Sequence, residues 1–168
     1  LAENTLVILT SDNGGLVAGN NPPTSNAPLR SGKGSPYEGG HRVPGIAWWP
    51  GRIMPAVSHD LAATFDLYPT FLSLAQASLP PHDGIDLSAL LFSGRLSDDR
   101  ALYWRIGEKK AVRAGAWKLV QTGATPPLLF NLKQDGGERH DLARVEPERR
   151  RELQALLTTW EAEMNQSS

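Results

Sequence analysis

The feature that most constrains the fold of this chain is a short apolar run that ends abruptly in polar and flexible residues. Residues 5–10 read Thr-Leu-Val-Ile-Leu-Thr, and Ser11, Asp12, Asn13 and two glycines follow them directly. A run that is apolar on both faces is typical of a strand buried in a parallel sheet. Such α/β sheets hold their ligands outside the carboxyl ends of the strands. The pattern therefore predicts an α/β fold with a polar site where this strand ends.

Asp12 and Asn13 place a carboxylate oxygen and an amide oxygen side by side at that point. Ca²⁺ and Mg²⁺ prefer oxygen ligands of this kind. A plain turn is the alternative, because Asp, Asn and Gly all tolerate tight-turn geometry. Two side chains cannot complete a metal site, so these residues by themselves leave both interpretations open.

The chain up to residue 80 reads as part of an α/β sheet. We expect strands at residues 6–10 and 43–48, a helix at 66–77, and a loop rich in Gly, Pro and Asn at residues 11–42. Loops of that length are usually functional or disordered. A functional loop is favoured here, because Lys33 lies between two glycines that would let an anion approach the backbone closely.

From residue 81 onward the pattern changes to short strands, turns and one long helix. We expect strands at residues 101–106, 110–114, 117–122 and 128–132, with a tight hairpin at Gly115. A helix begins at Pro147, since Pro suits the first helical position. Its apolar residues recur at helical spacing and form a stripe that covers the small antiparallel sheet: Leu153, Leu156, Leu157, Trp160 and Met164. We therefore divide the chain into domains at 1–80 and 81–168.

Composition excludes several classes of function. The 168 residues carry 17 Lys and Arg against 18 Asp and Glu, a net charge of −1, which provides no basic surface for nucleic acid or anionic membranes. The longest apolar runs fall far short of the ~20 residues that span a bilayer. The chain contains no cysteine, which excludes disulfides and thiolate zinc sites.

Five motifs occur in an order and spacing that resemble the carboxyl-terminal half of the sulfatase family. The first is the segment of residues 28–51, which follows the Ser-Asp-Asn-Gly strand and contains Lys33, Tyr37-Glu-Gly-Gly and Arg42-Val-Pro. The others are Asp66-Leu-Tyr-Pro-Thr, Asp83-Gly-Ile-Asp-Leu, Ala111-Val-Arg-Ala-Gly-Ala-Trp-Lys-Leu and Leu129-Phe-Asn-Leu. Each is weak alone, but five in collinear order are specific. The resemblance implies part of an alkaline-phosphatase-like α/β sheet, followed by a small antiparallel sheet packed with a C-terminal helix.

The resemblance also implies roles for three residues. Asp12 and Asn13 match ligands of a Ca²⁺ or Mg²⁺ ion, and Lys33 matches the lysine that binds a sulfate oxygen. Asn at position 13 favours sulfate esters, because related zinc-dependent phosphatases carry His there and imidazole suits zinc. A phosphoester or phosphonate hydrolase of the same superfamily is the weaker alternative.

The nucleophile of the family is missing from this chain. Sulfatases carry it in a Cys-x-Pro-Ser-Arg stretch, whose Cys, or Ser in some members, is oxidised to formylglycine. This chain has no cysteine and no Ser in that context. We therefore interpret it as a carboxyl-terminal fragment, inactive alone, of a periplasmic or secreted sulfatase that acts on a sulfated carbohydrate or aryl sulfate. The alternative is an independent non-catalytic module that oligomerises or binds a partner.

Three further residues are candidates for smaller roles. Glu38 and Arg42 lie four residues apart across two glycines and are expected to form a structural ion pair. Arg105 is a candidate substrate contact, because the smaller domain of sulfatases often reaches the substrate. His41 matches no family position that we can transfer. The apolar strand at residues 6–10 also predicts a homo-oligomer that forms through an unpaired sheet edge.

Overall fold

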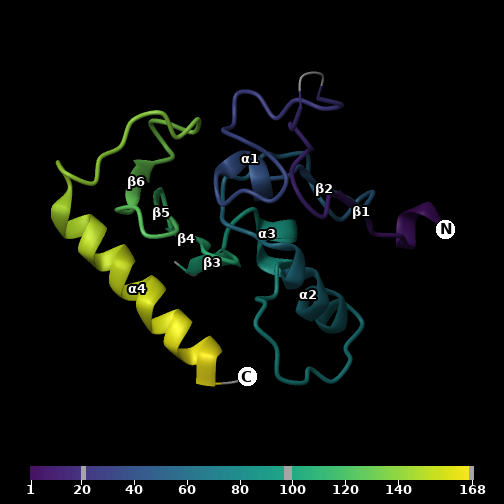
Figure 1. Cartoon of the computed structure of the whole chain (residues 1–168). Coiled ribbons are helices and arrows are strands. Elements are labelled where there is room, and N and C mark those ends of the chain that lie inside the picture. The colour runs from purple at the N-terminus through teal and green to yellow at the C-terminus, as the bar shows by residue number, and fades with distance from the viewer. Residues whose placement is uncertain (20–21, 97–99, 167–168) are drawn as a thin grey trace. The chain divides into compact units, whose positions relative to one another are not determined.

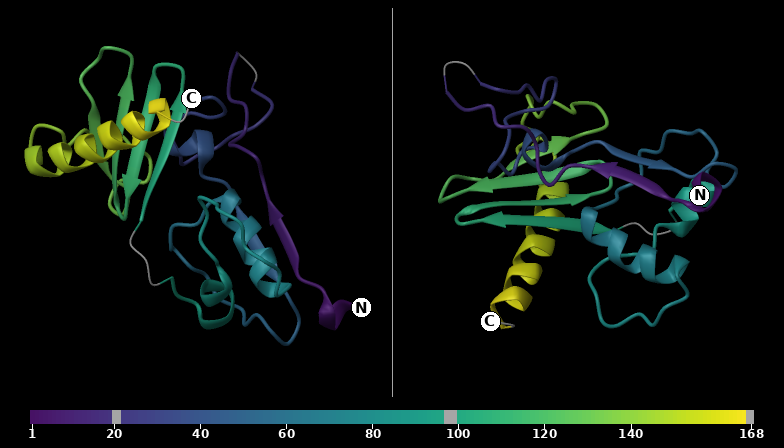
Figure 2. Two further views of the ribbon diagram at one scale, coloured as in Figure 1. Left: turned by 90° about the horizontal axis from the view of Figure 1, so that it is seen from below. Right: turned by 90° about the vertical axis from the view of Figure 1, so that its right-hand side faces the viewer.

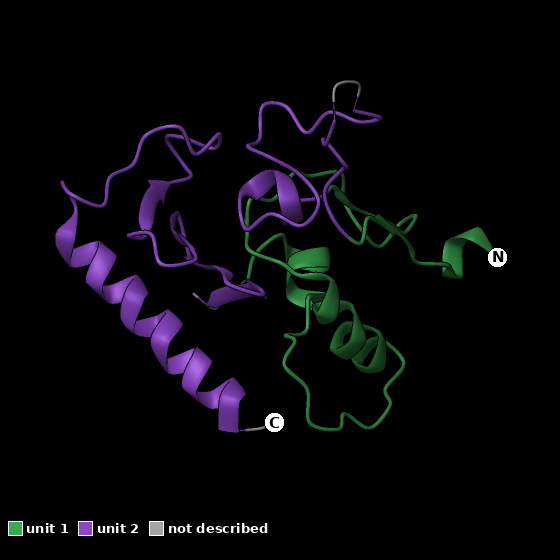
Figure 3. Cartoon of the chain, viewed as in Figure 1, with its two compact units in different colours: residues 1–12, 44–98 green, residues 13–43, 99–168 purple. Residues whose placement is uncertain are grey.

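The computed structural model describes residues 1–19, 22–96 and 100–166 (Figure 1). Their contacts group them into two compact units (Figure 3). Unit 1 comprises residues 1–12 and 44–98, and unit 2 comprises residues 13–43 and 99–168. The segment of residues 13–43 thus belongs with the second half of the chain. This grouping differs from the predicted boundary at residue 80, which stays a prediction for the protein as a whole.

Within the described residues, unit 1 contains two strands and two α-helices. They are β1 (Val7–Thr10), β2 (Gly45–Trp48), α2 (Leu67–Leu74) and α3 (Ser88–Ser93), with 3₁₀ helices at Ala2–Asn4 and Thr64–Asp66. β1 and β2 pair antiparallel, with Val7 opposite Trp48 and Thr10 opposite Gly45. The strands predicted at residues 6–10 and 43–48 and the helix predicted at 66–77 are therefore present, each shorter than expected.

We expected the first strand to lie in a parallel sheet, and this expectation is wrong for the structure of this chain. Among the described residues β1 pairs with β2 alone, and the pairing is antiparallel. Val7 is 46 % exposed and Leu9 is 56 % exposed, although both are apolar. Ile46 and Trp48 on β2 are also exposed. Apolar side chains on both strands therefore form a surface suited to burial, and the described residues leave it uncovered.

We predict that this exposed β1–β2 ribbon makes the chain associate. A strand edge that carries apolar side chains is a template for pairing with a second copy. In sedimentation velocity the chain should run as dimers or larger species, and Leu9→Lys should shift the distribution toward monomer. Thr122→Lys, which adds the same charge at an exposed strand end in unit 2, is the control. A strict monomer with strongly protected amides at Val7 and Ile8 would contradict the prediction.

The hydrogen bonds around Asp66 connect two of the sequence motifs in unit 1. The buried Asp66 carboxylate accepts the Ala63 N–H at 2.6 Å and the Ile85 N–H at 3.0 Å. One turn later, Thr70 Oγ1 donates to Asp66 O at 2.6 Å and accepts the Leu87 N–H at 2.8 Å. These bonds tie the start of α2 to the chain that precedes α3. The two motifs that contain these residues therefore serve the fold of unit 1.

Unit 2 is built around a four-stranded antiparallel sheet. Its strands, in order across the sheet, are β3 (Ala101–Ile106), β4 (Lys109–Ala114), β5 (Trp117–Thr122) and β6 (Leu128–Asn131). The helix α4 (Pro147–Gln166) crosses one face of the sheet (Figure 2). The β4–β5 hairpin turns at Gly115, whose φ of 56° favours glycine. The predicted strands, hairpin and terminal helix are confirmed.

Side chains alternate between the two faces of this sheet, and each face carries its own core. The core under α4 comprises Val112, Leu119, Leu129, Ala143, Leu153 and Leu157. The core on the opposite face comprises Ala111, Val120, Phe130 and Leu132, with Tyr37, Trp104 and Leu128 packed against it. The sheet therefore lies between α4 and the segment of residues 13–43, which supplies Tyr37. In the predicted helix stripe, Leu156 and Met164 are more exposed than expected, at 38 % and 37 %.

Candidate functional site

Backbone hydrogen bonds join the glycine-rich pieces of the segment 13–43. They run from Gly14 N–H to Gly40 O (3.0 Å), from Lys33 N–H to Gly15 O (3.1 Å) and from Gly39 N–H to Arg30 O (2.9 Å). A side chain at Gly14 would overlap the Gly39 carbonyl, so only glycine permits this close approach. The loop after Asn13, the turn around Lys33 and the short helix α1 (Glu38–His41) are therefore held together.

The Lys33 side chain is exposed at this turn. Gly32 does not provide space for an anion as expected, because the Gly15 carbonyl occupies the space beside it. Gly34, with a φ of 79°, has open space beside it. Lys109, at the start of β4, reaches the same turn, since its Nζ donates to Gly34 O at 3.4 Å. Two lysines therefore lie where an anion can approach the turn.

Asp12 and Asn13 follow β1 closely, with Asp12 exposed and Asn13 half-buried. Ser11 Oγ donates to Asp12 Oδ1 at 3.4 Å. The described part of the chain contains no group of three or more His, Cys, Asp or Glu side chains that could hold a metal ion. One carboxylate and one amide oxygen fit a hard divalent cation, but they fill only part of a Ca²⁺ shell of about six to eight oxygens.

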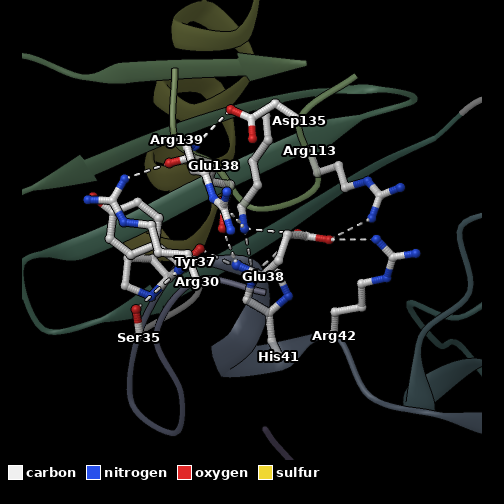
Figure 4. Close-up of polar contacts among 12 residues, drawn as sticks. Arg30, Ser35, Tyr37, Glu38, His41, Arg42, Arg113, Asp135, Glu138 and Arg139 are labelled. Atoms are coloured by element: carbon white, nitrogen blue, oxygen red, sulfur yellow. Dashed lines mark hydrogen bonds and ion pairs between the residues drawn. The ribbon is translucent and has the colours of Figure 1, made fainter. Parts of the chain in front are cut away.

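A buried cluster of charged side chains lies between the sheet and α1 (Figure 4). Its members are Lys118 of β5, Glu38 of α1 and Glu138, and none of the three side chains is exposed. Lys118 Nζ lies 2.9 Å from Glu38 Oε1 and 2.9 Å from Glu138 Oε1. The contact with Glu138 is an ion pair only, and Glu138 Oε1 has no aligned hydrogen bond. One ammonium group thus lies between two carboxylates in the interior of unit 2.

Two arginines approach the other oxygen of Glu38. Arg113 Nη1 lies 3.2 Å and Arg42 Nη1 lies 3.7 Å from Glu38 Oε2. The expected contact between Glu38 and Arg42 is therefore present, although Lys118 is closer. Burial raises the pKa of Glu38, but Lys118 and then Arg113 lower it by more, so this pKa lies below its usual range. Burial raises the pKa of Glu138, and Lys118 offsets that effect only in part.

His41 packs against the same lysine. Its ring stacks on Trp104, with 4.0 Å between the ring centroids, and its Nε2 lies 3.0 Å from Lys118 Nζ. Burial, and then the Lys118 charge, lower the pKa of His41 to about 4. The same Nε2 also lies 3.2 Å from Pro36 O, so it either accepts a hydrogen bond from Lys118 or donates one to Pro36, and a neutral imidazole can do either. His41 is thus part of the packing around the buried cluster.

The structure places Arg105 on the face of the sheet that α4 covers. Arg105 Nη1 donates to Asn165 Oδ1 at 3.3 Å, and the guanidinium lies 5.6 Å from the centroid of the Trp160 ring. The segment that carries Lys33 packs on the opposite face. Arg105 and Lys33 are therefore not brought together on one face, and a substrate contact by Arg105 stays a prediction.

Sequence reasoning missed the roles of Lys118, Glu138 and Lys109. A signal was available for Lys118, because it lies two residues from Val120 and so shares an inward face of β5 with it, where a lysine needs a partner. No comparable signal marked Glu138, which lies in a turn. Its backbone φ of 53° usually favours glycine.

Comparison with known proteins identifies the family. The family model described as Sulfatase matches residues 1–77. Arylsulfatase A of Homo sapiens is 37 % identical over 172 residues, which cover 84 % of this chain and 34 % of that protein. N-acetylgalactosamine-6-sulfatase of Canis lupus familiaris is 45 % identical over 180 residues, which cover 85 % of this chain and 34 % of that protein.

Solved structures agree with these relatives. The structure titled Ps i-CgsB in complex with k-i-k-neocarrahexaose is 34 % identical, with a TM-score of 0.78 over 98 % of this chain and 36 % of that one. The PsFucS1 sulfatase from Pseudoalteromonas sp. is 30 % identical, with a TM-score of 0.73 over 95 % of this chain and 38 % of that one. The chain therefore resembles part of a sulfatase, as its motifs predict, and its expected fold class is confirmed. It spans about a third of the length of the relatives that it matches.

Proposed function

We propose that this chain supplies part of the active site of a metal-dependent sulfuric ester hydrolase, in which Lys33 binds the sulfate group. The observation that carries the proposal is the hydrogen bond from Lys33 N–H to Gly15 O, which holds the lysine turn beside the loop that begins at Asn13. A sulfate ester bound at this turn would meet the ammonium of Lys33, whose main chain is held by this hydrogen bond. Preorganised charge of this kind stabilises the negative charge that develops as an ester bond breaks.

Asp12 and Asn13 are the residues that would hold the metal ion. When bound, a Ca²⁺ or Mg²⁺ ion supplies Lewis-acid polarisation and orientation of the ester. Lys33 binds a sulfate oxygen. The formylglycine nucleophile of the family arises from a Cys or Ser in a stretch that these 168 residues do not contain. We therefore propose that the reaction requires further polypeptide.

The substrate we propose is a sulfated carbohydrate or an aryl sulfate. N-acetylgalactosamine-6-sulfatase and arylsulfatase A, whose names contain these two classes, are among the relatives. Asn13 favours sulfate over phosphate esters, because imidazole rather than an amide suits the zinc of the related phosphatases. We also propose a secreted or periplasmic location. In the described part of the chain, no helix is long and apolar enough to cross a membrane.

Metal binding by the 168-residue chain should be weak. Asp12 and Asn13 supply two of the about six to eight oxygens that Ca²⁺ takes, so water must complete the shell and the affinity should be millimolar or weaker. Calorimetric titration with Ca²⁺ measures this affinity, and Asp12→Ala should abolish whatever binding is seen. A micromolar site that is lost in Asp12→Ala would contradict the prediction, since it would require further ligands within this chain.

Replacement of Lys33 in the protein encoded by the complete reading frame tests the proposed function. Lys33→Met removes the charge and keeps an apolar side chain. We expect kcat/KM for an aryl sulfate to fall by about 10²–10³-fold, as for the loss of one preorganised donor. Lys133→Met, at another exposed lysine of unit 2, is the control and should leave kcat/KM unchanged. No loss at Lys33, or an equal loss in both variants, would overturn the proposed role.

A further inference from the structure

The turn that carries Lys33 is attached at both of its ends to one residue, Glu138. Arg30 Nη1 donates to the Glu138 backbone O at 2.8 Å, and the Glu38 N–H donates to Glu138 Oε2 at 2.6 Å (Figure 4). Arg30 precedes Lys33 in the chain and Glu38 follows it. The main chain and the side chain of a single residue thus hold the two ends of the stretch 30–38.

A glutamate at position 138 is unfavourable on two counts. Its φ of 53° lies in the left-handed region, where a residue with a side chain is strained relative to glycine. Gly136 and Gly137 precede it, so the turn contains glycine and yet has Glu at the strained position. Its carboxylate is also buried, which is unfavourable unless the charge is paired. Both penalties imply that the side chain makes contacts that glycine could not provide.

Lys118 completes the attachment of these residues to the sheet. Lys118 is the second residue of β5, and its Nζ lies 2.9 Å from an oxygen of Glu38 and 2.9 Å from an oxygen of Glu138. Glu38 begins α1, and Gly40 in the same helix accepts the Gly14 N–H, directly after Asn13. Contacts therefore run without a break from the sheet, through Glu138 and Glu38, to both functional loops.

We propose that Glu138 is a positioning residue that fixes the stretch 30–38, and with it Lys33, against the sheet of unit 2. It acts through Arg30 and Glu38 and touches no substrate. Its consequence for catalysis rests on the proposed role of Lys33. The positioning itself is a property of this chain and can be measured without substrate or metal.

Amide hydrogen exchange in the 168-residue chain tests the proposal. The probes are backbone N–H groups within and beside the turn, those of Lys33, Ser35 and Gly39, which donate to Gly15 O, Gly32 O and Arg30 O. In Glu138→Ala we expect the protection of these three amides to fall by ~10-fold or more relative to the amides of β5, because their local opening is no longer restrained.

Two further variants separate positioning from general stabilisation. Glu138→Gln keeps an oxygen that can accept the Glu38 N–H, and it should retain most of the protection that Glu138→Ala loses. Glu161→Gln makes the same change on the α4 face, where Glu161 Oε1 pairs with Lys110 Nζ at 2.6 Å. This matched control should leave the three probes unchanged.

The outcomes are distinct. Unchanged probes in Glu138→Ala, or an equal loss in the β5 amides, would overturn the proposal, because Glu138 would then have no effect or only a global one. If Glu138→Ala does not fold, Arg30→Met removes the other attachment at the surface. A loss confined to Lys33 and Ser35 then supports the proposal, and an unchanged pattern overturns it. A failure of the Lys33→Met activity test would refute the proposed function and leave the exchange result intact.

Discussion

Lys118→Met should lower the free energy of unfolding of this chain by about 3–5 kcal/mol, which is the usual cost of removing one partner from a buried ion pair. Methionine has a similar length and volume, so the substitution removes charge and not packing. The ammonium that lies 2.9 Å from both Glu38 Oε1 and Glu138 Oε1 disappears. Two buried carboxylates are then left beside each other, and Arg113, which lies 3.2 Å from Glu38 Oε2, still pairs with Glu38. Chemical denaturation followed by circular dichroism measures the loss.

Lys110→Met is the matched control for this experiment. Lys110 lies on the adjacent strand and faces α4, where its Nζ is 2.6 Å from Glu161 Oε1 and both side chains are partly exposed, at 26 % and 22 %. Solvent-exposed ion pairs contribute about 0–1 kcal/mol, so this variant should lose less than ~1 kcal/mol. If Lys118→Met lost no more than Lys110→Met, the buried cluster would not contribute to stability as its geometry implies.

The parts of the fold that could be predicted from sequence are those decided by residues close together in the chain. The strands of unit 2 alternate, Gly115 permits the hairpin, and Pro147 suits a helix start. The surroundings of β1 could not be predicted in the same way. Its apolar pattern indicates burial on both faces, but the pattern does not say which segment provides the cover. In the structure β1 has an antiparallel partner and exposed side chains.

The candidate site shows the same difference between residues that are close together in the chain and residues that are far apart. Asp12, Asn13 and Lys33 could be proposed from sequence because each lies in a continuous motif that resembles a known family, and their roles stay predictions. The buried cluster could not, because Glu38 is 80 residues from Lys118 and 100 residues from Glu138 in the chain. No local pattern links residues at such separations, and only the packing of the segment 13–43 on the sheet brings them together.

The 168-residue chain alone should show no sulfatase activity. In the proposed site, Asp12 and Asn13 bind a metal ion and Lys33 binds a sulfate ester, but covalent catalysis also needs an activated nucleophile. The chain has no Cys, and no Ser in the Cys-x-Pro-Ser-Arg context that carries the nucleophile in the family. When catalytic groups act together, removal of one of them commonly lowers the catalytic rate by about 10⁴-fold or more.

The most direct test of whether these residues form one part of a sulfatase site is the steady-state hydrolysis of an aryl sulfate. The purified 168-residue chain is compared with the protein encoded by the complete reading frame. Both proteins are assayed at equal concentration, with and without added Ca²⁺. We predict turnover by the longer protein and only background hydrolysis by the chain. Turnover by the chain that disappears in Lys33→Met would contradict this prediction, because the nucleophile would then lie within these 168 residues.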